Sequence, residues 1–395
     1  MNRIDRQTEA VRVQVVPAIS EVDPADWNRC ANPQCGPDYN PFVSWQFLHA
    51  LEASGAVSAK TGWVPRHLVL DGPGERPAGV VPCYLKSHSQ GEYVFDYGWA
   101  DAYESAGGRY YPKLQVSVPF TPVPGRRLLV GAGDGVDQRR QALAAALAEL
   151  ASRHDASSVH VTFLSETEWR TLGDMGYLQR TDQQFHWQDQ DFGSFDGFLD
   201  SLASRKRKAV RKERSRALSN GISIEWLSGN DIREEHWDAF YGFYMDTGSR
   251  KWGRPYLNRA FFSLIGESMA DQILLVMARR NGHYIAGALN MIGSDTLYGR
   301  HWGCIEHHDC LHFELCYYQA IDFALANGLS RVEAGAQGSH KLARGYMPTT
   351  TYSAHFILDA NFRHAVDDFL ERERQHVAWE QQALAEHTPF KRSGS

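Results

Sequence analysis

The chain repeats one order of elements, and this order limits its fold more than any other feature. In the first half, apolar runs at residues 66–70 and 78–86 flank a turn rich in glycine and proline, and an aromatic run at 92–97 predicts a third strand. Leucines then recur at helical spacing within 141–153, and a β-rich run follows at 158–164.

The second half shows the same order. Apolar runs at 272–278 and 284–292 are joined by Asn281-Gly282, a dipeptide typical of two-residue hairpins. A helix is expected at 311–327, and a short strand follows it. The alternation of strands and helices in both halves predicts an α/β fold of two duplicated modules, each with a mixed β-sheet flanked by helices.

The length of 395 residues exceeds what one ordinary hydrophobic core organises and indicates two domains. A polar stretch at 188–193 separates the repeats. We therefore place an N-terminal module at residues 1–190 and a C-terminal module at 191–395, the second with a basic helical insertion and a long C-terminal helix.

The amino terminus lacks the apolar segment of a signal peptide, because its first ten residues are polar and charged. No apolar run approaches the ~20 residues of a membrane span. Six cysteines in such a chain are expected to be reduced thiols. These features predict a cytoplasmic protein without a membrane span.

A glycine-rich loop at 335–346 is the first candidate site. Its three glycines let the backbone bend, and His340, Lys341 and Arg344 place an imidazole and two cations within it. Such a loop suits the binding of an anion or the stabilisation of a developing oxyanion. The alternative is a solvated turn with incidental charge.

A second candidate is a basic run on an otherwise acidic chain. Eight basic residues and one acid, Glu213, lie between Arg205 and Arg216. Cations on all sides of a helix leave no apolar face to bury, so the run is either a solvated helix or a contact for a polyanion such as the phosphates of tRNA or CoA. The residues that we assign to this contact are Arg205, Arg207, Arg211 and Lys212.

Residues 304–316 contain cysteines and histidines, which are ligands that zinc prefers. Their spacing matches no standard zinc arrangement, and Cys304 and Cys316 are better explained as small buried apolar residues. We therefore expect no metal. A glycine-rich turn at 131–135 opens a helix and suits either a pyrophosphate or a simple turn with Asp134 as N-cap.

Five segments carry a resemblance to a known family. The sequence resembles the FemAB-like predicted N-acyltransferases of the GNAT acyltransferase group at residues 40–44 (NPFVS), 93–104 (YVFDYGWADAYE), 110–119 (YYPKLQVSVP), 312–319 (HFELCYYQ) and 335–345 (GAQGSHKLARG). The resemblance implies a double GNAT-like fold and transfer of an acyl group to an amine. Fem-type enzymes use aminoacyl-tRNA as donor and a cell-wall precursor as acceptor, whereas ordinary GNAT enzymes use acyl-CoA.

Acyl transfer to an amine needs a group that accepts the proton of the attacking ammonium. Glu314, Glu306 and His301 are the candidates, in that order, and the sequence does not separate them. For Glu314 the alternative is a role in the first turn of the helix, which the macrodipole favours. Lys341, with His340 beside it, would then stabilise the oxyanion.

An acidic and aromatic patch in the first half suits an acceptor that carries an amine. Asp101 and Tyr103 lie close to Trp99, and charge pairing with cation–π contact would hold an ammonium there. Solvated loop residues and ordinary aromatic packing are the alternative.

The sequence therefore predicts an N-acyltransferase that moves an acyl or aminoacyl group from acyl-CoA or aminoacyl-tRNA to a small-molecule or peptide amine, with a cell-wall precursor as one candidate acceptor. Neither a tightly bound cofactor nor a DNA partner is expected. The alternative is a non-catalytic protein that binds peptidoglycan or another anionic ligand on the same fold.

Overall fold

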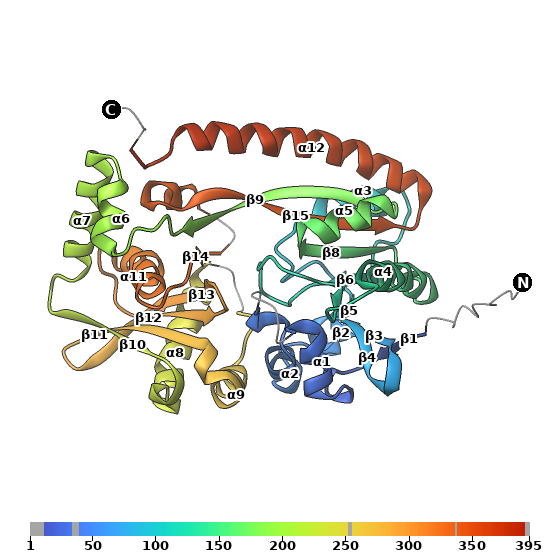
Figure 1. Ribbon diagram of the computed structural model, residues 1–395, viewed down its shortest axis with the longest axis horizontal. Helices are drawn as coiled ribbons and strands as arrows, with labels where there is room; N and C mark the ends of the chain where they lie inside the picture. The colour runs from blue at the N-terminus through green and yellow to red at the C-terminus, as the bar shows by residue number, and fades with distance from the viewer. Residues whose placement is uncertain (1–11, 34–38, 252–254, 336–337, 392–395) are drawn as a thin grey trace, which may run out of the picture.

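The computed structural model describes residues 12–33, 39–251, 255–335 and 338–391. Within them, eleven strands form one sheet that runs through both halves of the chain in the order β10-β11-β12-β13-β14-β9-β15-β8-β6-β5-β2 (Figure 1). In that order their bounds are Ile222–Leu227, Ile273–Arg280, His283–Ile292, Thr296–Cys304, Arg331–Glu333, Leu178–Gln188, Met347–Ile357, Ser158–Leu164, Lys113–Val116, Cys83–Lys86 and Trp63–Pro65.

A second, four-stranded sheet belongs to the first half. Its order is β1-β3-β4-β7, and its strands are Val13–Val16, His67–Asp71, Pro77–Val81 and Leu129–Val130. The α-helices α1 to α12 span Pro24–Ala31, Trp45–Ala53, Tyr97–Ser105, Val136–Arg153, Glu166–Asp174, Phe195–Ser201, Ser204–Ala217, Glu234–Lys251, Arg259–Met269, Leu311–Phe313, Gln319–Ala326 and Ala360–Glu386. None of the described helices is long and apolar enough to cross a bilayer.

The predicted mixed α/β architecture is confirmed. In the second half, the apolar side chains of α8 and α9 pack on one face of the sheet and those of α11 pack on the other. Asn281 and Gly282 adopt φ values of 51° and 81°, as the hairpin between β11 and β12 requires. Gly328 has a φ of 68° directly after α11, consistent with a C-terminal cap.

The strand predicted at 92–97 is wrong. This segment leaves the sheet, and α3 begins at Tyr97. Two buried lysines form ion pairs with acidic residues of this segment. Lys113 Nζ lies 2.7 Å from Glu92 Oε2 and also binds Asp96. Lys86 Nζ lies 3.7 Å from Glu92 Oε1. Burial makes a cation depend on such partners, so these ion pairs override the β-propensity of the aromatics.

The two halves exchange strands at the centre of the sheet. β9, from the first half, lies between β14 and β15, and β15, from the second half, lies between β9 and β8. The parallel pairs β6–β8 and β13–β14 flank these central strands at corresponding positions. Because the sheet is continuous across residue 190, the domain boundary there stays a prediction.

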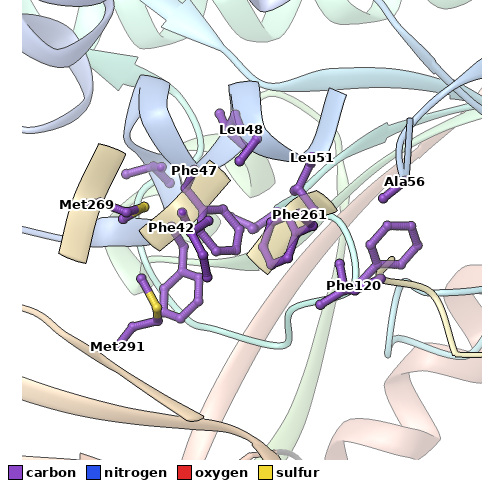
Figure 2. Close-up of a cluster of buried hydrophobic side chains, with 14 of the residues drawn as sticks. Phe42, Phe47, Leu48, Leu51, Ala56, Phe120, Phe261, Met269 and Met291 are labelled. Atoms are coloured by element: carbon purple, nitrogen blue, oxygen red, sulfur yellow. The ribbon is translucent and has the colours of Figure 1, made fainter. Parts of the chain in front are cut away.

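A hydrophobic cluster joins the halves below the large sheet. Figure 2 shows aromatic rings from the first half, Phe42 and Phe47, beside Phe261 of α9. Phe47 makes edge contacts with Phe42 at 5.0 Å and with Phe261 at 5.7 Å between ring centroids. This packing fixes the first half against the face of β12 and β13 that carries Leu289, Met291 and Tyr298.

Candidate functional site

The sheet opens between β13 and β14. These strands pair in parallel from Thr296–Arg331 to Tyr298–Glu333, where β14 ends. β13 continues to Cys304. The gap holds a cavity of about 90 Å³ with Asn290, Gly299, Arg300, His301 and Tyr317 among its lining residues. Separated parallel strands give a ligand access to main-chain groups in the middle of a sheet.

Arg300 lies at a β-bulge beside this opening. Leu289 pairs with His301 and Asn290 with Gly299, so Arg300 has no residue opposite it on β12. Its side chain is half-buried and lines both the cavity between the strands and a narrower one at the interface of the two halves. Its guanidinium carbon lies 5.4 Å from the centroid of the Phe42 ring, and burial lowers the pKa of Arg300 to about 10.

Glu333 ends β14 and is buried next to this arginine. Burial raises the pKa of its carboxyl to about 7, although the charges of Arg300 and Arg331 act in the opposite direction. Its Oε2 has no hydrogen-bond partner within the described residues. A carboxyl that titrates near neutral pH suits a general base. Neither Glu333 nor Arg300 is among the site residues predicted from the sequence.

Lys341 supplies a buried cation from the glycine-rich loop, of which residues 336 and 337 lie outside the described part. Its Nζ donates a hydrogen bond to the carbonyl oxygen of Gly335 at 2.8 Å, and only 2% of the residue is exposed. Burial, with a smaller contribution from Arg300, lowers the pKa of Lys341 to about 7. Within the predicted loop, Ser339–Arg344 form a 3-10 helix.

His340 and Arg344 hold this loop against neighbouring elements. His340 is exposed, and its Nε2 lies 2.9 Å from the hydroxyl of Tyr317, which lines the cavity between β13 and β14. Arg344 is nearly buried, pairs with Glu213 of α7 at 2.8 Å and lies 3.5 Å above the Phe313 ring. Arg344 therefore joins the loop to the basic helix.

Glu314 lies in an interruption of the predicted helix 311–327. Residues Glu314–Tyr318 form a π-helical turn, and Glu314 is fully buried. Its Oε1 accepts hydrogen bonds from Arg214 Nη2 at 2.9 Å and from Gln319 Nε2 at 2.8 Å. Like Glu333 and Lys341, it lines none of the described cavities. The geometry gives it a structural contact with α7, and its catalytic role stays a prediction.

The other two candidate bases differ in setting. Glu306 pairs with Arg280 and with His308 Nε2 at 3.0 Å, at the rim of a cavity of about 390 Å³. This cavity shares Trp302 and His312 with the cavity between the strands. His301 lines that smaller cavity, and burial lowers its pKa to about 3, so it is neutral at pH 7.

The basic helix α7 has one anchored face and one open face. Arg214 binds Glu314 and Asp322, and Arg207 Nη1 donates to Asp200 at 2.9 Å. Arg205, Arg211 and Lys212 are exposed, and Arg211 lies 3.8 Å from Asp196. A groove of about 380 Å³ runs between α7 and the glycine-rich loop, lined by Arg205, Lys206, Ala209, Val210, Glu213, Ala343 and Arg344.

The structure does not bring Asp101 and Tyr103 to this site. Both lie on α3, beside the start of α12 and at the other end of the sheet from β13 and β14 (Figure 1). Tyr103 stacks on Phe362 of α12 with centroids 4.4 Å apart, and Asp101 is exposed. Their role in acceptor binding stays a prediction without support from the geometry.

Two further sequence features were the residues at 304–316 and the glycine-rich turn at 131–135. In the described residues, no group of three histidine, cysteine, aspartate or glutamate side chains is arranged to hold a metal ion. The turn at 131–135 leads into α4 with Gly135, at a φ of 76°, as N-cap. Asp134 does not cap this helix.

Solved structures show that the fold is shared. FemX is 13% identical, with a TM-score of 0.55, over 90% of this chain and all of that chain. L-PGS from Bacillus licheniformis is 10% identical, with a TM-score of 0.50, over 85% and 99% of the two chains. A conserved protein of unknown function from Bacteroides thetaiotaomicron is 13% identical, with a TM-score of 0.53, over 88% and 100%. Comparison with curated proteins gives no match.

The family comparison covers nearly the whole chain. The sequence profile of the FemAB-like family, described as peptidoglycan biosynthesis and recognition, matches residues 18–392. The match includes both halves, the strand pair β13–β14 and the basic helix. The chain therefore belongs to the FemAB-like family.

Proposed function

We propose that this protein is an N-acyltransferase whose reaction takes place between β13 and β14. The amine nitrogen of the acceptor attacks the carbonyl carbon of an activated acyl or aminoacyl donor. An amide bond forms, the ester or thioester bond of the donor breaks, and the leaving oxygen or sulfur takes up a proton. Family membership and the shared fold support this class of reaction.

Glu333 is the proton acceptor in this proposal. The single observation that carries it is a buried carboxyl with a pKa of about 7 at the point where the two strands separate. At neutral pH a substantial fraction is ionised, as a general base requires. Lys341, with a pKa of about 7, provides a cation for the tetrahedral oxyanion.

In this proposal the donor binds beside α7 and α10, the helix that follows β13. A phosphate site at the start of α10 has little support, because α10 spans only Leu311–Phe313 and the preceding loop carries Glu306 and Asp309. The exposed cations of α7 and the groove beside them favour a polyanionic donor. Aminoacyl-tRNA fits these features better than acyl-CoA, and a cell-wall precursor peptide fits the description of the family as acceptor.

A series of Glu→Gln variants tests the assignment. We expect Glu333→Gln to lower kcat by about 10²–10⁴-fold, the range of general-base catalysis, with little change in donor affinity. Glu306→Gln and Glu314→Gln test whether either of the other two candidate carboxylates is the base instead. Glu149→Gln, on the surface of α4, is the control. Transfer by Glu333→Gln at the rate of the unmodified protein would exclude this base.

The same series addresses the alternative of a binding protein. Purified protein is incubated with aminoacyl-tRNA or acyl-CoA and a precursor peptide, and the acylated product is measured by mass spectrometry. Ligand-induced stabilisation without product, for every donor, would favour a peptidoglycan-binding role.

A further inference from the structure

The cavity between β13 and β14 contains a tyrosine that the proposed reaction does not use. Tyr317 belongs to the π-helical turn Glu314–Tyr318, is 3% exposed and lines this cavity. Its hydroxyl lies 2.9 Å from Nε2 of His340, in the 3-10 helix that follows β14. π-helical turns are rare and occur frequently at functional sites. In the proposed reaction Glu333 removes a proton from the amine, and the departing atom of the acyl donor needs a proton in return.

Tyr317 and Glu333 lie on opposite faces of the sheet. Glu333 pairs with Tyr298, whose ring packs in the hydrophobic cluster of α8 and α9, whereas the Tyr317 ring packs in the cluster of α11. The cavity reaches both faces, because its lining includes Leu289 from the first cluster and Ala288 from the second. A carboxyl on one face and a hydroxyl on the other are thus available at the two sides of the opening.

His340 connects the hydroxyl to solvent. His340 is exposed, whereas the Tyr317 ring is buried and makes an edge contact with the Tyr346 ring at 5.4 Å. Burial and the charges of Arg344 and Lys341 lower the pKa of His340, so its ring is neutral at pH 7. A neutral ring with its proton on Nε2 donates to the Tyr317 oxygen, and this leaves the hydroxyl proton free for a group in the cavity.

The hydroxyl suits a leaving group that departs through oxygen. Burial raises the pKa of Tyr317 above its ordinary value, so the hydroxyl keeps its proton throughout the neutral range. A thiol has a pKa of about 8.5, and a thiolate therefore departs near neutral pH without a proton. The oxygen of an alcohol is far more basic and departs readily only when an acid protonates it. A buried phenol is therefore useful for an oxyester and dispensable for a thioester.

We propose that Tyr317 is a catalytic proton donor to the departing oxygen of an oxyester acyl donor, and that His340 positions this hydroxyl and resupplies its proton. The ester C–O bond breaks as the Tyr317 proton moves to that oxygen. Nε2 of His340 gives its proton to the Tyr317 oxygen, and Nδ1 takes one from water. Glu333 releases the proton of the amine to solvent, so the protons balance. This inference rests on the proposed function and specifies the chemical class of its donor.

The test presents one acyl group in two forms. The unmodified protein and each variant receive the same aminoacyl group as the ribose oxyester of tRNA and as the thioester of CoA, with a precursor peptide as acceptor. With the oxyester, we expect Tyr317→Phe to lower kcat by about 10²–10⁴-fold, the range of general acid catalysis, and to change KM little. With the thioester the rate should stay within about threefold, because a thiolate departs unaided.

Tyr177→Phe is the matched control. Tyr177 lies in the first half, is 4% exposed, and its hydroxyl donates to the carbonyl oxygen of Ala144 at 2.8 Å. Both substitutions remove one buried hydroxyl and its hydrogen bond, so a shared loss of stability is separated from a loss of rate. Thermal melts show whether each variant is folded.

His340 acts through Tyr317, and its variant is tested by rescue. His340→Ala should lower the oxyester rate by at least about tenfold, since the hydroxyl loses its proton supply. Free imidazole should restore this rate, because the position of the missing ring is exposed. Imidazole should not restore Tyr317→Phe. His340→Ala carries the test if Tyr317→Phe does not fold.

Several results would overturn the inference. These are an unchanged oxyester rate in Tyr317→Phe, an equal loss in Tyr177→Phe, an equal loss with the thioester, or no rescue of His340→Ala by imidazole. Transfer by the unmodified protein from the thioester alone would also overturn it. Each of these results leaves the proposed function intact, whereas no transfer from either donor by the unmodified protein would contradict the proposed function and this inference together.

Discussion

Arg214 of α7 and Glu314 of the π-helical turn are joined by two hydrogen bonds, from Nε at 3.2 Å and from Nη2 at 2.9 Å, both to Glu314 Oε1. The same guanidinium also reaches Asp322 Oδ2 at 2.6 Å and lies 4.2 Å above the Phe195 ring. Arg214 thus links α7 to the helical segment that follows the opening of the sheet.

The first prediction concerns this pair. Glu314→Ala should lower the free energy of unfolding by about 3 kcal/mol, because it removes a fully buried carboxylate and leaves the partly buried Arg214 without this partner. Glu314→Gln should lower it less. Chemical denaturation measures the loss, and turnover per folded molecule should stay close to that of the unmodified protein. A large fall in turnover without a loss of stability would restore Glu314 as the base.

A second prediction concerns the pH dependence of the rate. Glu333 must be ionised to accept a proton, and Lys341 must be protonated to stabilise an oxyanion, and burial brings the pKa of each to about 7. The rate should therefore pass through a maximum near pH 7. Lys341→Arg should move the alkaline limb to higher pH, since arginine stays protonated. An alkaline limb that does not move in this variant would show that Lys341 is not the group that titrates.

A third prediction concerns stability. The folded-state pKa of Glu333 is raised from its ordinary value of 4.5 to about 7. Between these values the native state keeps a proton that the unfolded state has released, so this residue makes stability fall as pH rises through the window, by up to about 1.4 kcal/mol per pH unit. Glu333→Gln should flatten the curve between pH 4.5 and 7. A curve of unchanged slope would show that the carboxyl does not titrate in this range.

A fourth prediction concerns the exposed face of α7. Arg205→Glu with Arg211→Glu should weaken binding of aminoacyl-tRNA and reduce the dependence of log Kd on log salt concentration by about one for each phosphate that is no longer neutralised. Filter binding at several salt concentrations measures both. Arg153→Glu, on the exposed end of α4, is the control, and an equal effect there would point to net charge rather than to α7.

The sequence predicted the repeated order of elements because hairpin dipeptides, leucine spacing and helix caps are local signals. Asn281-Gly282 is such a signal, and the structure has the expected left-handed turn there. The prediction of a strand at 92–97 failed for the opposite reason. Lys86 and Lys113 determine the path of this segment, and both lie outside it, on the strands β5 and β6.

The candidate site was predicted only in part. Lys341 was found because glycines and cations stand together in the chain, and the structure buries it beside the opening. Arg300 and Glu333 were missed, although a charged residue next to buried apolar residues of a strand is itself a signal. What brings them together is the parallel pairing of β13 with β14, across the helical segment between them, which no local pattern encodes.

The reciprocal insertion of β9 and β15 has a consequence for how the molecule comes apart. Each half supplies a strand that pairs with strands of the other half. A chain cut at residue 190 would therefore leave β8 and β9 in one fragment, and β14 and β15 in the other, with backbone groups that have lost their pairing strands. The protein should accordingly melt in a single cooperative transition, and co-expressed fragments should reassemble only as an intertwined pair.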